Sequence, residues 1–176
     1  PHRKPADIPS AGSAASVLPD RIQFREELTD KTVEEFGARV QGIVGRAAQR
    51  MGMPLATAQQ YVVRSLLNPR HYPDSRDFLA RAVCRMEEGI LQGFGRPLGL
   101  FGLKVVFPQT PEQPNLFSLR IESFNQDPRS LFVENLGTFT HCMLPGGVSD
   151  LGRNLALTYA FLAERATAFL ARFDHA

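Results

Sequence analysis

Cys142 and His141 are adjacent, and this is the one place in the sequence where a thiol nucleophile stands beside a possible base. A cysteine nucleophile needs such a base, because the thiolate is the reactive form. The pair falls at the end of an expected strand, however, where neighbouring side chains point to opposite faces. His71 is a second candidate base, although nothing in the sequence brings it near. A hydrolase or transferase that uses Cys142, with His141 or His71 as the base, is therefore an alternative function and not the leading one.

The sequence contains no recognisable metal-binding or phosphate-binding motif. The four histidines are scattered, and none lies one helical turn from a carboxylate or cysteine ligand in a recognisable arrangement. The glycine-rich segment 93–99 leaves an expected helix and enters a strand, which is the opposite order to a nucleotide-binding loop. Gly146 and Gly147 precede a helix, but Asp150 at its start would repel a phosphate. We therefore expect no metal and no cofactor.

Arginine dominates the basic residues, with 17 arginines and three lysines. Arg39, Arg46 and Arg50 fall near one side of the first expected helix, and such a stripe can contact phosphates. Acidic residues are interspersed with the arginines, no aromatic residues accompany them, and the formal net charge is only +2. A solvated helix face is the simpler interpretation. Anion or nucleic-acid binding through these arginines remains a second alternative, and the charge balance disfavours nucleic acid as a partner.

Three helices are expected in the first half of the chain. Thr32 and Glu35 have the spacing of a capping box, after which apolar residues recur every three or four positions as far as Met51. A second helix is expected from Pro54 to Leu67, before Asn68-Pro69. A third is expected to begin at Asp74 or Ser75 and to reach Leu91.

Three strands are expected next, because β-branched and aromatic residues then alternate with polar ones. The strands cover residues 103–107, 116–124 and 131–140, and the turn 125–130 makes the last two a hairpin. Glu134 is expected across from Arg120 on the wet face. Residues 21–28 read as a short strand or an extended lead-in.

A long helix is expected to close the chain, starting at Ser149 or Asp150. Its main apolar seam consists of Leu155, Tyr159, Leu162, Ala166, Phe169 and Phe173. Further apolar residues beside this seam indicate a helix that buries more than one side. We expect protein contacts through Leu157, Phe161, Ala168 and Phe173.

The sequence as a whole predicts a flexible tail over residues 1–20 and one α+β domain over residues 21–176. That domain has three N-terminal helices, a three-stranded antiparallel meander and a long C-terminal helix packed on the sheet. No apolar run reaches the roughly 18 residues of a membrane span, and two cysteines are too few for a disulfide framework, which favours a cytoplasmic protein. The leading functional hypothesis is a non-enzymatic protein-interaction or regulatory domain of the adaptor or chaperone-like kind, acting as a homodimer or with a protein partner.

Overall fold

The structure, a computed structural model, describes residues 12–87 and 89–175. The chain forms two compact units, each made of two separate stretches of sequence. Unit 1 combines the chain up to Ala56 with Cys142–Arg153, and unit 2 combines Thr57–His141 with the residues from Asn154 onward. The elements are mixed α and β, and every strand pairing is antiparallel. A mixed α+β fold with a C-terminal helix is therefore confirmed.

Unit 1 consists of a hairpin, a long helix and a short two-residue ladder. Strand β1 (Gly12–Val17) pairs with β2 (Ile22–Glu27), and helix α1 (Val33–Met51) follows. Strand β3 (Leu55–Ala56) pairs with β8 (Cys142–Met143), and helix α3 (Val148–Ala160) begins in this unit. The core of unit 1 is formed by Val40, Val44, Cys142 and Leu151.

The start and end of α1 are set by the local signals expected from the sequence. The Thr32 hydroxyl accepts the amide of Glu35 at 3.2 Å, and the Glu35 carboxylate accepts the amide of Thr32 at 2.9 Å. Gly52 ends the helix with φ 61°, a conformation that costs glycine little. The predicted first helix and its capping box are confirmed.

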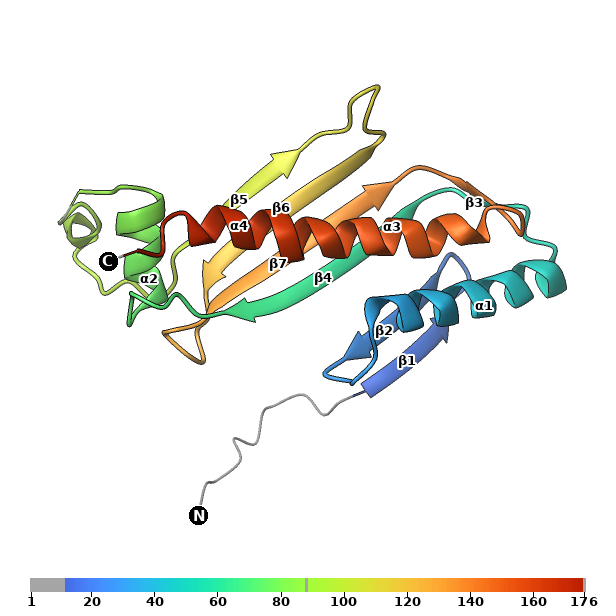
Figure 1. Ribbon diagram of the computed structural model, residues 1–176, viewed down its shortest axis with the longest axis horizontal. Helices are drawn as coiled ribbons and strands as arrows, with labels where there is room; N and C mark the ends of the chain where they lie inside the picture. Colours follow the sequence, from blue (N-terminus) through green and yellow to red (C-terminus); the bar gives the residue numbers. More distant parts are fainter. Residues whose placement is uncertain (1–11, 88, 176) are drawn as a thin grey trace, which may run out of the picture. The chain divides into compact units, whose positions relative to one another are not determined.

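Unit 2 is a four-stranded sheet with a helix on one face (Figure 1). Its strands are β4 (Gln59–Leu67), β5 (Gly102–Phe107), β6 (Asn115–Ser123) and β7 (Leu131–Phe139), arranged in the order β4-β7-β6-β5. The helix continues from α3 through the π-helical segment η3 (Phe161–Ala166) into α4 (Thr167–Ala171). Its side chains Leu162, Ala166 and Leu170 pack on the buried sheet residues Leu119, Ile121, Leu131 and Val133.

Three predictions about the layout are wrong. Residues 54–67 form β3 and β4 instead of a second helix, so the sheet has four strands and not three. The third helix is short: α2 (Ser75–Asp77) runs into the π-helical η1 (Phe78–Val83), and the chain then turns irregular before the 3-10 turn η2 (Leu91–Phe94). Arg85 with φ 50° and Gly89 with φ 88° interrupt any helix there.

The stretch 1–20 was predicted as a flexible tail, and part of it lies outside the described residues. Strand β1 lies within this stretch, and all six of its residues are exposed. Hydrogen bonds to β2, rather than burial, hold it in place. This explains why hydrophobic patterning gave no sign of it.

The seam of the C-terminal helix differs from the predicted one after its first turns. Leu155, Leu162 and Ala166 are buried as predicted, but Tyr159 and Phe169 are 45% and 37% exposed. Thr158 and Leu170 are buried in their place. The wider turn of η3 makes buried positions recur every four residues from Thr158 to Leu170, so the expected alternation of four and three breaks down.

Candidate functional site

The face of the sheet opposite the helix carries exposed apolar side chains. Val62 and Leu66 of β4 are 49% and 51% exposed, and Val106 of β5 is 49% exposed. Strand alternation places Leu136 of β7 and Leu116 of β6 on this same face, and both are partly exposed. We call these residues the open face. An antiparallel sheet with one solvated face normally presents polar residues there, so the half-exposed apolar side chains of the open face depart from the usual pattern.

A row of charged residues crosses the middle of the open face. The strand register aligns Arg64, Glu134, Arg120 and Lys104 from β4 to β5. Arg64 Nε lies 2.7 Å from Glu134 Oε2, and Arg120 Nε lies 3.8 Å from Glu134 Oε1. The predicted pairing of Glu134 with Arg120 is confirmed. Glu134 is thus paired within the sheet, and the apolar side chains of the open face lie on either side of this charged row.

The two edges of this sheet differ in how well they are protected. Natural edge strands are commonly blunted by lysine and proline, which discourage another strand from pairing. Edge strand β5 has six residues, carries Lys104 in its middle and is followed by Pro108. Edge strand β4 has nine residues and contains neither lysine, proline nor glycine. Its one charged residue, Arg64, forms an ion pair with Glu134 of the neighbouring strand β7. The β4 edge is therefore the one open to strand addition.

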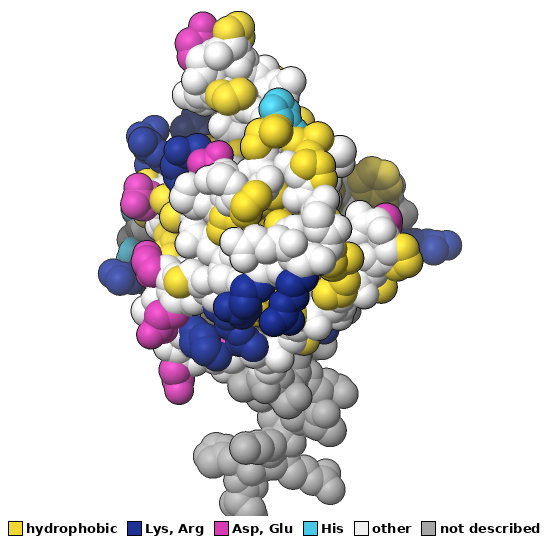
Figure 2. Space-filling model, turned by 90° about the vertical axis from the view of Figure 1, so that its right-hand side faces the viewer, with side chains coloured by type: hydrophobic (Ala, Val, Ile, Leu, Met, Phe, Trp, Pro, Cys, Tyr) yellow, Lys and Arg dark blue, Asp and Glu magenta, His cyan; other side chains and the backbone are white. Residues whose placement is uncertain are grey.

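The interaction residues predicted on the C-terminal helix divide between covered and exposed positions. Phe161 packs against Phe107 and Phe117 of the sheet, with ring centroids 5.1 and 4.4 Å apart. Phe173 packs against the core of unit 2. Leu157 is 48% exposed, and Ala168 is also exposed. The apolar surplus of this helix is thus partly used by its own sheet, and the exposed hydrophobic side chains are not confined to it. Figure 2 shows such side chains at the surface.

The environment of Cys142 is that of a structural thiol. The residue is 2% exposed, and its Sγ lies 3.0 Å from the carbonyl oxygen of Gly147. Burial, and then the nearby Asp150 carboxylate, raise the pKa of the Cys142 thiol. A nucleophilic cysteine needs the opposite shift. His141 is exposed, and both it and His71 belong to unit 2, whereas Cys142 belongs to unit 1.

The three arginines predicted as an anion-binding stripe on α1 are not equivalent. Arg39 is occupied, because it hydrogen bonds to Ser13 and lies 3.5 Å from the Glu26 carboxylate. Arg46 and Arg50 are exposed on the helix. The stripe therefore reduces to two solvated side chains.

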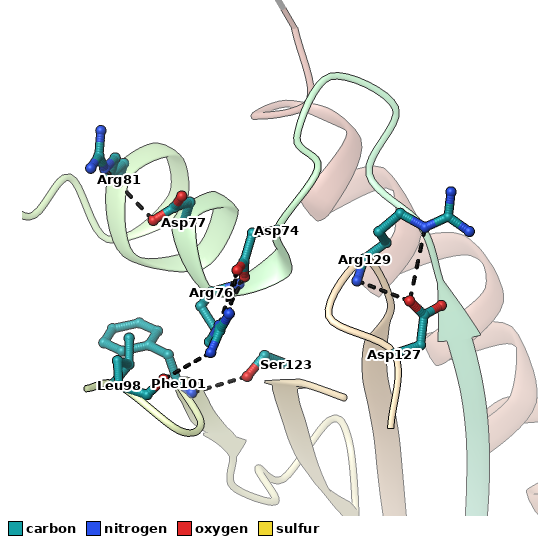
Figure 3. A network of polar contacts seen from close by, with 9 residues as sticks. All are labelled: Asp74, Arg76, Asp77, Arg81, Leu98, Phe101, Ser123, Asp127 and Arg129. Atoms are coloured by element: carbon teal, nitrogen blue, oxygen red, sulfur yellow. Dashed lines mark hydrogen bonds and ion pairs between the residues drawn. The ribbon is translucent and has the colours of Figure 1, made fainter. Parts of the chain in front are cut away.

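A network of polar contacts holds the start of α2 (Figure 3). The Asp74 carboxylate accepts the amide of Arg76 at 2.8 Å and the Arg76 Nε at 3.0 Å, so the expected cap at Asp74 is confirmed. Arg76 Nη1 in turn donates to the carbonyl of Leu98 at 2.8 Å, a link that the sequence did not signal. Hydrogen bonds from the Arg76 side chain are the largest cause that lowers the pKa of Asp74.

Replacing Asp74 by asparagine is expected to lower the free energy of unfolding by about 1 kcal/mol at pH 7, because the charged hydrogen bonds to Arg76 are lost. The folded pKa of Asp74 is depressed, so its stabilisation is present above the unfolded pKa of about 3.9 and is lost as pH falls through the folded value. Urea unfolding at neutral and at acidic pH measures the loss of stability in Asp74→Asn and how far that loss shrinks in acid. Asp77→Asn is the control, since Asp77 lies 3.8 Å from Arg81 in an exposed pair. A difference for Asp74→Asn that persisted undiminished in acid would contradict the charge argument.

The described residues include neither a membrane-spanning helix nor a metal-binding cluster. Within the described ranges, no helix has the length and apolar character needed to span a bilayer. Residues 12–87 and 89–175 likewise hold no group of three histidine, cysteine or acidic side chains placed to bind a metal ion.

No protein-family model matches the chain, and comparisons with curated proteins and with solved structures give no match.

Proposed function

We propose that this chain is a non-enzymatic protein-interaction domain that forms a homodimer through the β4 edge and the adjoining open face. The observation that carries the proposal is the contrast between the two edges of the sheet. Strand β5 is shortened and carries lysine, whereas β4 is long, lacks any blocking residue and presents Val62 and Leu66 beside its free edge.

A second copy fits this edge because a strand can pair with itself about a two-fold axis in an antiparallel arrangement. With the axis at Val62, that residue meets Val62 of the second copy and Arg64 lies opposite Gln60 of the second copy. This pairing brings no like charges together. Two four-stranded sheets then become one continuous sheet, and the open-face row that contains Leu136 and Val62 continues across the junction into the same row of the second copy.

Light scattering coupled to size-exclusion chromatography, at high micromolar concentration, tests the proposal. The chain is expected to elute as a dimer, and Val62→Lys as a monomer, because a lysine at the junction would lie against its own copy. Leu157→Lys is the matched control: Leu157 is 48% exposed and Val62 49%, but Leu157 lies on the helix. It is expected to stay dimeric.

Each other outcome of this experiment counts against the proposal. A wild-type chain that is monomeric at this concentration would remove the homodimer. Loss of the dimer in Leu157→Lys but not in Val62→Lys would move the contact to the helix. Circular dichroism of Val62→Lys is expected to match the wild type, since the side chain is half exposed and has room for the longer group.

A further inference from the structure

Unit 2 has an open pocket of about 330 Å³ at the end of β4. It is lined by residues 68–73 of the loop that follows β4 and by Arg129 of the turn between β6 and β7. Its volume is at the lower end of the range for small-molecule sites. Two of its lining residues, Arg70 and Arg129, carry guanidinium groups, and neither belongs to the surface proposed above for dimerisation.

Hydrogen bonds with Asp174 and Ser130 hold the loop that forms this pocket. The Asp174 carboxylate accepts the backbone amides of Arg70 and His71 at 2.7 and 3.0 Å. The Ser130 hydroxyl lies within hydrogen-bonding distance of Asn68 Oδ1, at 2.8 Å. Prolines at positions 69 and 73 restrict the backbone further. A binding site on this loop would need little reordering when a ligand arrives.

The carboxylates near the pocket are engaged by their own partners. Asp127 lies 2.7 Å from the Ser130 hydroxyl and accepts the amide of Arg129 at 3.2 Å. Hydrogen bonding, with Ser130 as the largest cause, lowers the pKa of Asp127. Asp174 is occupied by two amides and by the ring of His71. Both acidic groups are therefore ionised at neutral pH and turned toward groups of the protein.

The Arg70 guanidinium, by contrast, is available. Within residues 12–87 and 89–175, no hydrogen bond or ion pair engages it. The Arg129 side chain is 71% exposed, and its Nε lies 3.9 Å from Asp127 Oδ1. Figure 3 shows this contact. His71 Nδ1 faces two acceptors of Asp174, the carbonyl at 3.1 Å and Oδ1 at 3.2 Å. The Nδ1 atom therefore donates to Asp174, which ties the His71 ring to the C-terminal segment.

We propose that this pocket binds a phosphate group, either as free phosphate or as a small phosphate monoester. The planar guanidinium groups of Arg70 and Arg129 supply the paired donors that suit phosphate oxygens. The site is independent of the homodimer, because it uses a loop and a turn instead of the β4 edge.

Phosphate titration followed by ¹H–¹⁵N NMR tests this site, with sodium chloride at matched ionic strength as the salt control. Inorganic phosphate is expected to give saturable shifts at the amides of Asn68, Arg70, His71, Tyr72 and Arg129. Phosphoserine forms a second arm: tighter binding than inorganic phosphate would identify a monoester as the ligand, and equal binding would identify phosphate alone.

Two double variants, each of which removes two arginines, provide the decisive comparison. Arg70→Ala with Arg129→Ala is expected to weaken binding at least about tenfold, since both guanidinium clamps are lost. Arg46→Ala with Arg50→Ala on α1 is expected to leave it unchanged. The site would be overturned if phosphate gave no shifts beyond those of the chloride control. It would also be overturned if the two double variants weakened binding equally, which would reveal nonspecific attraction to arginine.

Discussion

Replacing Gly137 by alanine is expected to lower the free energy of unfolding of unit 2 by about 2 to 3 kcal/mol, the upper part of the range for an overpacked core. Gly137 lies in β7 beneath the C-terminal helix, and a Cβ there would overlap the Thr158 hydroxyl. It would also lie 3.0 and 3.1 Å from the rings of Phe139 and Phe117. Thr158 cannot move aside easily, because it is fully buried and its hydroxyl donates to the carbonyl of Asn154 at 2.8 Å.

Urea unfolding of two further variants separates this overlap from a general effect of losing a glycine. Gly93→Ala is the control, since a Cβ at Gly93 meets nothing within 4 Å, and it is expected to change stability by less than about 0.5 kcal/mol. Thr158→Ala removes the overlapping hydroxyl, so adding it to Gly137→Ala is expected to recover part of the lost stability. A double variant in which the two losses simply add would show that the overlap is not the cause.

Phe78→Ala is expected to lower the free energy of unfolding by about 3 to 5 kcal/mol, as for other large aromatic side chains removed from a core. Phe78 is 1% exposed, belongs to the core cluster of unit 2 and makes an edge-on contact with Tyr72 at a centroid distance of 5.2 Å. Phe94 lies three residues beyond the end of the predicted third helix, and it is 77% exposed. Phe94→Ala is therefore expected to change stability by less than about 0.5 kcal/mol. Equal effects in chemical denaturation would contradict this assignment of the core.

Elements with strong local signals were predictable from the sequence. Helix α1 begins and ends where the Thr32–Glu35 box and Gly52 place it, because caps act on the nearest amides and carbonyls and need no distant partner. The β6–β7 hairpin follows for the same reason, since the turn 125–130 contains the residues that such turns require.

Strand β4 was missed because both of its faces carry apolar residues. Tyr61 and Val63 face the helix, whereas Val62 and Leu66 lie on the open face, so the period of two that marks a strand is lost. The remaining pattern matched a helix. Sequence rules tend to fail at functional positions, and here the failure falls on the strand that we propose as the dimer contact.

The pocket at the end of β4 was not predictable, because its parts come from distant segments. His71 was noted only as a possible base for Cys142, and Arg129 and Asp174 were not singled out. Asp174 is 103 residues from His71 in sequence, and it reaches the loop only because the C-terminal helix crosses the sheet to its far end. No short-range sequence pattern predicts a contact between residues so far apart in the chain.

The interleaving of the two units has a consequence for synthesis on the ribosome. The partners of α1 in its core, Cys142 and Leu151, lie far along the chain: Cys142 follows the end of α1 at Met51 by 91 residues (142 minus 51). At about 5 to 20 residues per second, translation of that interval takes on the order of ten seconds. All four strands of the larger sheet emerge in the meantime. During this interval the apolar stripe of α1 has Phe24 and Ala56 as possible cover but lacks Cys142 and Leu151. In the nascent chain, part of the stripe is therefore exposed to chaperones that recognise apolar helix faces.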